Sequence, residues 1–207
     1  MVLLCMNSPF VAALTLENRM SMDTTPMHFT MNSTTYSVPR NYLYEMSNWS
    51  GGEQPDGVSV RVVYPGLKPY SKETEACMLR KEKCRVYEIW MTATKYSSEQ
   101  GIGNLLRLAK FPAGQPGPYG FTFFEIGNGI NRTNLYKAKT GGVPIIFECI
   151  TYDINWKNGA TCHHFAHTES GAALSYFFDS NDGLADAVYV DEAIARMFNN
   201  FTINTIK

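Results

Sequence analysis

Three runs in the second half of the chain decide the fold: VPIIFECITYDI at 143–154, TCHHFAHT at 161–168 and AALSYFF at 172–178. They are rich in β-branched and aromatic residues, and the turn dipeptides Asn158-Gly159 and Ser170-Gly171 separate them. Such runs with such turns predict antiparallel strands joined by hairpins. Similar runs at 119–126 and 134–139 precede them, so we expect an antiparallel meander in this half of the chain.

The first half adds further strands and one helix to this meander. Alternating apolar residues between turn formers predict a hairpin within 27–38, ended by Pro39, and strands at 58–64 and 85–92. The helix is predicted over 98–111, where apolar residues recur at helical spacing before Pro112. The next stretch, 111–121, holds three prolines and three glycines and predicts an irregular loop.

A second amphipathic helix is predicted at the end of the chain. Asp191 is the expected N-cap, and one helical face carries Ile194, Met197, Phe198 and Phe201. The fold class is therefore α+β: a twisted, mainly antiparallel sheet with one mid-chain helix and a C-terminal helix packed on it. Residues 26–207 have no internal repeat and no strong linker, which predicts a single α+β domain.

Composition limits the function. The chain has 207 residues, 44% of them apolar and 13% aromatic, which suffices for a sizeable core. With 18 basic and 19 acidic residues the net charge is −1, so we expect no nucleic-acid partner. Charged residues make up 18% of the chain, where about 25% is usual in soluble domains. A surface built from uncharged polar groups favours an exported protein.

Four of the five cysteines form two local pairs, Cys77 with Cys84 and Cys149 with Cys162, which is typical of an exported disulfide-bearing domain. Four cysteines allow three connectivities, and five reduced thiols in a cytosolic protein are the alternative. A tight Asn158-Gly159 turn would place Cys162 opposite Asn155, far from Cys149. A Cys149–Cys162 bond instead needs a looser loop of about four residues. We favour the bond.

Residues 1–25 read as a leader or a residual signal segment. An apolar stretch from Val2 ends in small residues near Ala13, as in a signal peptide, but the usual positively charged start is missing. A lipid anchor on Cys5 is left open, although the preceding Leu3-Leu4 is atypical for one. The stretch is too short to span a bilayer, and no other apolar run is long enough.

Three of the four histidines lie in the run at 161–168, which raises the alternative of a metal-dependent hydrolase. His163 and His167 share a face on either a strand or a helix. A zinc site needs a third ligand, and no specific zinc motif occurs. We therefore prefer a histidine-rich exposed strand, and expect no metal and no other cofactor. No nucleophile motif or phosphate loop is present either, so we expect no enzyme activity.

A protein-binding surface is the remaining interpretation. Tyr119 and Phe121 lie on the constrained Pro-Gly stretch, and Trp49 lies beside another Gly-rich loop. Aromatic residues on constrained backbone are favoured anchors in protein interfaces. The alternative is that these side chains cover the ends of the core, which we favour for Phe121. A secreted module that binds some other ligand is a further alternative.

Several segments together resemble a known family. They are FTMNSTTYSVPRNYL at 29–43, DGV at 56–58, VYPGLKPY at 63–70, the two cysteine pairs and the amphipathic C-terminal helix. This set, across 27–201, resembles small periplasmic immunity proteins of bacterial type VI secretion effectors. The resemblance implies export by a signal peptide, a periplasmic location and a cognate toxin, lipase-like or acting on the cell wall, whose active site the protein blocks. It brings no catalytic residue.

Overall fold

The computed structural model describes residues 19–31, 33–45, 50–54, 57–93, 98–127, 132–138, 145–151, 160–168, 171–179 and 183–205. The strands are β1 (Pro26–Met31), β2 (Thr34–Pro39), β3 (Gly52–Glu53), β4 (Val58–Val63), β5 (Val86–Thr92), β6 (Gln115–Pro116), β7 (Thr122–Ile126), β8 (Arg132–Lys137), β9 (Ile146–Thr151), β10 (Thr161–His167), β11 (Ala173–Asp179) and β12 (Thr202–Thr205). The α-helices are α1 (Glu75–Met78), α2 (Ser98–Arg107) and α4 (Ala187–Phe201), and the 3-10 turns are η2 (Arg40–Tyr42), η3 (Pro118–Gly120) and η4 (Leu184–Asp186).

The strands form two sheets. The larger has the order β4-β5-β11-β10-β9-β8-β7-β6, and each neighbouring pair is antiparallel. The smaller has the order β12-β2-β1-β3, in which β1 and β3 run parallel and the other pairs antiparallel. The α+β class, the antiparallel meander from β7 to β11 and the two helices are confirmed. The separate small sheet is a feature that the sequence pattern did not indicate.

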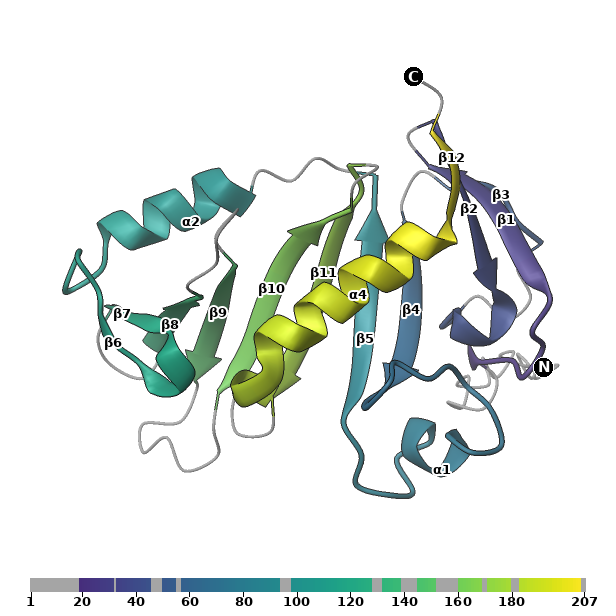
Figure 1. Cartoon of the computed structure of the whole chain (residues 1–207), viewed down its shortest axis with the longest axis horizontal. Coiled ribbons are helices and arrows are strands. Elements are labelled where there is room, and N and C mark those ends of the chain that lie inside the picture. The colour runs from purple at the N-terminus through teal and green to yellow at the C-terminus, as the bar shows by residue number, and fades with distance from the viewer. Residues whose placement is uncertain are drawn as a thin grey trace, which may run out of the picture.

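The small sheet is built on the predicted N-terminal hairpin. β1 and β2 pair with Met27 opposite Val38 and Phe29 opposite Tyr36, and all four side chains are buried. Alternate residues of each strand therefore face the core, as in a sheet with one covered face. β12 follows α4 directly and pairs with β2, so the two ends of the described chain meet in this sheet (Figure 1).

The large sheet is covered differently on its two faces. On one face lies α4, which crosses the strands obliquely (Figure 1), and its Ile194 and Phe198 share the main core cluster with Val60, Ile89 and Tyr176 of the sheet. The other face is covered near its two ends. The α1 segment packs over one end in a cluster with the ends of β4 and β5, and α2 packs over the other on β7, β8 and β9.

Both local cysteine pairs form disulfides. Cys149 lies directly opposite Cys162 in the pairing of β9 with β10, and the two are bonded. This is the register that the favoured bond required; the Asn158-Gly159 turn and Cys5 lie outside the described residues. The second bond joins Cys77 in α1 to Cys84, just before β5.

Three sequence expectations about elements are wrong. Asp191 is not the N-cap of the C-terminal helix, because α4 begins at Ala187 after Asp186, and Asp191 lies buried inside it. The mid-chain helix ends at Arg107 rather than 111, since Ala109 already pairs with β7 through a bridge to Ile126. The stretch 111–121 is not wholly irregular, because β6 pairs with β7 and η3 follows it.

Residues 19 and 20 pack against the rest of the protein, although they fall inside the predicted leader. Met20 is buried in the cluster beneath α1 together with Tyr44, and the backbone nitrogen of Glu45 donates to the carbonyl of Arg19. Residues 1–18 lie outside the described part of the chain. Within the described part, no helix combines the length and the apolar character needed to cross a membrane.

Candidate functional site

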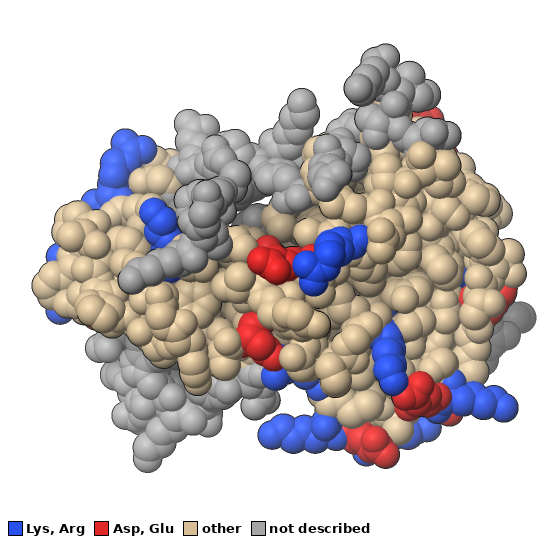
Figure 2. Space-filling model, in the orientation of Figure 1, with Lys and Arg blue, Asp and Glu red and all other residues tan. Residues whose placement is uncertain are grey.

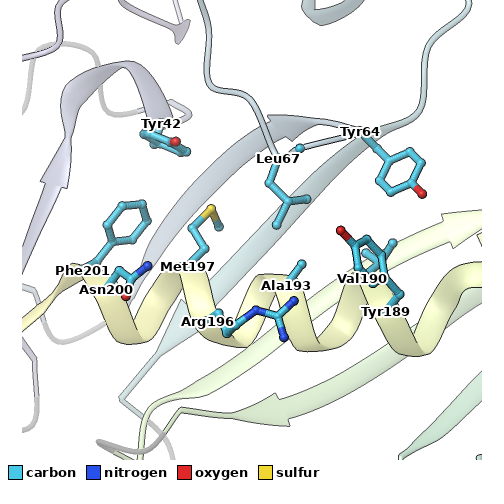
Figure 3. Close-up of a pocket in the computed structure, with 11 residues that line it drawn as sticks. Tyr42, Tyr64, Leu67, Tyr189, Val190, Ala193, Arg196, Met197, Asn200 and Phe201 are labelled. Atoms are coloured by element: carbon cyan, nitrogen blue, oxygen red, sulfur yellow. The ribbon is translucent and has the colours of Figure 1, made fainter.

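A groove of about 400 Å³ runs between α4 and the turn that follows β4; we call it the α4 groove. It is lined by Tyr42, Tyr64, Gly66, Leu67, Tyr189, Val190, Ala193, Arg196, Met197, Asn200 and Phe201. Figure 3 shows Tyr42 and Phe201 at one end, Tyr64 and Tyr189 at the other, and Leu67 between them facing the helix. The walls are therefore aromatic and aliphatic, with Arg196 and Asn200 as polar groups on the helix.

The turn wall of the α4 groove is held by its own backbone. Val63 and Lys68 exchange two backbone hydrogen bonds of 2.8 and 2.9 Å, which close the turn between them. Gly66 has a φ of +87°, a conformation that L side chains rarely adopt, so glycine is required there. This closed turn fixes Tyr64 and Leu67 opposite the helix.

An ion pair joins the turn to the start of the helix. Arg85 donates to Asp186 at 2.6 Å, and its guanidinium carbon stacks 4.3 Å from the centre of the Tyr64 ring. The hydrogen bond between Tyr64 and Asp186 raises the pKa of the Tyr64 hydroxyl. Tyr64 therefore stays protonated and uncharged at neutral pH, as a hydrogen-bonding group at the end of the groove.

A buried polar network fixes α4 on the large sheet. The Tyr176 hydroxyl donates to Asp191 Oδ1 at 2.9 Å, and His164 Nε2 lies 3.2 Å from the same oxygen. His164 Nδ1 donates to the backbone carbonyl of Ile146 at 2.7 Å. Burial raises the pKa of Asp191, while His164 and Tyr176 oppose that shift. The network connects β9, β10 and β11 to the helix, so the groove wall on α4 has a fixed position.

The outer side of α4 remains accessible beside this groove. Tyr189 is 61% exposed, and Arg196 forms a solvent-exposed pair with Glu192 at 3.6 Å. Figure 2 shows a small group of charges in the middle of this side, where α4 crosses in Figure 1, with uncharged surface around it and further charges at the lower right and at the left edge. The lining residues of the groove include no carboxylate, histidine or cysteine. What they offer is apolar contact and neutral or cationic hydrogen-bond donors.

Of the three histidines of β10, the structure describes the side chains of His163 and His164. His163 and His164 point to opposite faces of the sheet, since His164 bonds to Asp191 of α4 while His163 stacks on Phe177 at 4.4 Å. His163 Nε2 lies 3.1 Å from Ser175 Oγ, and burial together with the nearby His164 lowers the pKa of His163 to about 4. The side chain of His167 lies outside the described residues.

Away from β10, the described chain brings possible metal ligands together at one place. Cys77, Glu82 and Cys84 lie close together, but the two sulfurs are already bonded to each other. Disulfide sulfurs are not thiolates, which are the form of cysteine that binds metal. The described residues therefore bring no three-ligand set together around His163.

The aromatic residues predicted as partner anchors have different positions. Tyr119 is 66% exposed in η3, with a φ of 55°, between Pro118 and Gly120. Phe121 is 5% exposed and packs edge-on against Tyr136 and Phe147, so it is a core residue and not part of the surface. Trp49 lies outside the described residues.

The residues of the α4 groove were not identified as a site from the sequence. Tyr42 belongs to the PRNYL segment and Tyr64 to Leu67 belong to the YPGL segment, both of which carry the family resemblance. The sequence therefore pointed to these residues only through their place in those two segments. What the sequence could not supply was the spatial meeting of these two segments with 189–201.

The comparisons with known proteins concern the fold. No protein-family model matches the chain, and no curated protein matches it in sequence. Among solved structures, the iron-regulated outer membrane lipoprotein FrpD of Neisseria meningitidis is 16% identical, with a TM-score of 0.60 over 90% of this chain and 96% of FrpD. Smlt3025, an immunity protein of the Stenotrophomonas maltophilia type IV secretion system, is 15% identical, with a TM-score of 0.59 over 87% of this chain and 94% of Smlt3025. The chain thus shares its fold with these two proteins, and the secretion system named for Smlt3025 is of type IV.

Proposed function

We propose that this protein is an extracytoplasmic immunity protein that binds a cognate secreted toxin and blocks it. The observation that carries the proposal is the α4 groove, an accessible surface lined by three tyrosines, one of which lies on a helix fixed from beneath. Tyr and Arg side chains supply much of the binding energy in protein interfaces. A fixed surface also loses less conformational entropy on binding than a mobile one. The shared fold with Smlt3025 supports the same role.

The periplasm is the proposed location. Two disulfides within one small chain are typical of an oxidising compartment. The predicted leader at 1–25 would direct export, and Cys5 would be the position of a lipid anchor if one is attached. Mass spectrometry of the protein from a native host's periplasmic fraction would test both points. A mature mass that still includes residues 1–18 would contradict a cleaved leader.

The type of toxin is also part of the proposal. We retain the expectation that the toxin is a lipase-like or cell-wall-acting effector, because a periplasmic inhibitor protects against an attack made in that compartment. The protein would act by occupying the toxin's active site, and its own groove residues would contribute contacts rather than catalysis. A type VI system remains the expectation from the sequence resemblance.

Co-purification with the protein encoded beside its gene tests the proposal. We expect a stoichiometric complex and protection of cells that carry the toxin in their periplasm. Ala193→Trp places a large ring inside the α4 groove and should abolish protection, whereas Ala185→Trp, at an exposed position in η4, should not. Free mixing of the two wild-type proteins without association would overturn the proposed function.

A further inference from the structure

A second pocket lies on the face of the large sheet that is opposite α4. It has a volume of about 290 Å³ and is lined by Arg61, Arg80, Val86, Glu88, Trp90 and Phe177. We call it the sheet pocket. It borders the uncovered middle of that face, between the end that the α1 segment covers and the end that α2 covers. Arg61 lies in β4, and the turn wall of the α4 groove directly follows that strand, so both sites border the same edge of the sheet.

Arg61 is the unusual residue of this pocket. Its side chain is buried, at 4% exposure, yet its Nε and Nη1 atoms have no hydrogen-bond partner among the described residues. Among the described residues, the guanidinium contacts the Tyr44 ring, whose centre lies 4.9 Å away. Buried charges in proteins are nearly always paired, because removing a charge from water is costly. A guanidinium buried without an anion therefore needs an explanation.

The carboxylate opposite Arg61 forms no ion pair with it among the described residues. Glu88 lies directly opposite it in the pairing of β4 with β5, on the same face of the sheet. None of the ion pairs of the described residues includes Arg61 or Glu88. Arg80, which is exposed, adds a second guanidinium at the pocket. Two cations face one carboxylate, so the pocket has an excess of positive charge.

Exposed aromatic side chains form the other wall of the sheet pocket. Trp90 is 42% exposed and Phe177 is 52% exposed, although both are large apolar groups in central strands. Phe177 also stacks on His163, which extends the aromatic surface along β10. Arg and Trp are the residue types most enriched at the centre of protein interfaces.

We propose that the sheet pocket receives an acidic side chain, Asp or Glu, from the protein partner. This inference rests on the proposed function, because it takes the occupant to be part of a bound protein. A carboxylate matches the planar donor array of a guanidinium, and it would supply the counter-charge that Arg61 lacks. The aliphatic part of the same side chain would lie against Trp90 and Phe177. Glu88 limits the affinity, because it repels the incoming carboxylate.

Small probes test the pocket without any partner. Trp90 fluorescence is followed while the wild-type protein is titrated with N-acetylglutamic acid α-amide, which carries only the side-chain carboxylate. N-acetylglutamine carries only the α-carboxylate, and N-acetylglutamine amide carries no carboxylate. We expect saturable binding of the first probe, with a change in emission that Trp90→Phe removes. The proposal would be overturned if N-acetylglutamine amide bound as tightly as the first probe, if N-acetylglutamine bound more tightly, or if the wild-type protein did not bind the first probe.

Charge variants assign that binding to the guanidinium. Arg61→Met keeps the apolar stem of the side chain and should weaken the first probe at least tenfold. Glu88→Gln removes the repulsion and should tighten it several-fold. Arg107→Gln, at an exposed arginine of α2 that lines neither pocket, should leave it unchanged. The melting temperature of Arg61→Met should equal or exceed that of wild type, because an unpaired buried charge is lost. A lower melting temperature with unchanged probe binding would show that Arg61 is structural and would overturn the inference.

The partner complex separates this inference from the proposed function. If the wild-type protein forms no complex, the proposed function fails while the probe titration still decides the chemistry of the pocket. If the complex forms and Arg61→Met binds as tightly as wild type, the proposed function stands and the acidic anchor is wrong. We expect the complex to form and Arg61→Met to weaken it at least tenfold.

Discussion

Substitution of Asp191 by alanine is the most informative test of how α4 is fixed. Asp191 Oδ1 accepts the Tyr176 hydroxyl at 2.9 Å and lies 3.2 Å from His164 Nε2, and the His164 and Asp191 side chains are 6% and 9% exposed. Removing Asp191 leaves two buried polar groups, the Tyr176 hydroxyl and His164 Nε2, without their partner, and the expected total cost is about 3–5 kcal/mol. Had Asp191 been the N-cap, its loss would cost about 1 kcal/mol. The two roles thus differ by a measurable amount.

Denaturant unfolding with the disulfides intact provides the assay. We expect Asp191→Ala to lower the free energy of unfolding by about 3–5 kcal/mol. Glu192→Ala is the matched control, since Glu192 is the next residue on the same helix and forms only an exposed pair with Arg196 at 3.6 Å. Its expected cost is about 0.5 kcal/mol or less. Equal and small losses in both variants would refute the buried network as the anchor of α4.

Three further predictions use the same unfolding measurement. Replacing Cys149 and Cys162 by alanine removes a crosslink with a sequence separation of 13, and should cost about 3 kcal/mol; no loss would mean that the bond does not constrain the unfolded chain. The pKa of His163 is lowered to about 4 from its ordinary 6.5, so its neutral form stabilises the fold above pH 6.5 and that contribution is lost as pH falls toward 4. The loss should be about 1–2 kcal/mol after allowance for a partly exposed ring, and His163→Gln should flatten the curve in that range; an identical curve would contradict the assignment. Gly57 and Gly52 both have a φ near +105°, but a Cβ at Gly57 would clash with the Met91 carbonyl oxygen, whereas a Cβ at Gly52 would meet no atom. Gly57→Ala should therefore lower the free energy of unfolding by at least about 1 kcal/mol more than Gly52→Ala. Equal losses in the two variants would contradict the clash.

Much of the fold could be predicted because its signals are local. The meander from β7 to β11 follows from alternating or apolar runs between turn residues. The register of β9 with β10 followed from the requirement that Cys149 and Cys162 lie opposite each other. A disulfide fixes the register more strongly than a turn dipeptide, since a one-residue slip would move one cysteine to the other face.

One of the errors, the expected N-cap at Asp191, arose because a polar residue is buried. Asp191 precedes an apolar helical run in the sequence and so has the pattern of an N-cap. Its partners in the structure are Tyr176 in β11 and His164 in β10. The packing of α4 on the large sheet brings these two residues to Asp191. Arg61 in β4 is also a buried polar residue, at the edge of the sheet face that the α1 segment covers.

The candidate site could not be predicted for the same reason. The walls of the α4 groove come from η2, from the turn after β4 and from α4, which are far apart in sequence. Tyr119 was predicted from local loop chemistry and is indeed exposed, but it lies in η3 and not in the lining of this groove. Local chemistry identifies exposed aromatic residues, and tertiary packing decides which of them line a groove.

The affinity of the wild-type protein and two tyrosine variants for the protein encoded beside its gene tests the central claim most directly. Tyr189 lines the α4 groove and Tyr119 lies outside it, and they are similarly exposed, at 61% and 66%. We predict tight binding by wild type, a loss of at least about tenfold in Tyr189→Ala, equal to about 1.4 kcal/mol, and no change in Tyr119→Ala. A weakened Tyr119→Ala with an unchanged Tyr189→Ala would place the partner elsewhere, and absence of wild-type binding would contradict the proposed function.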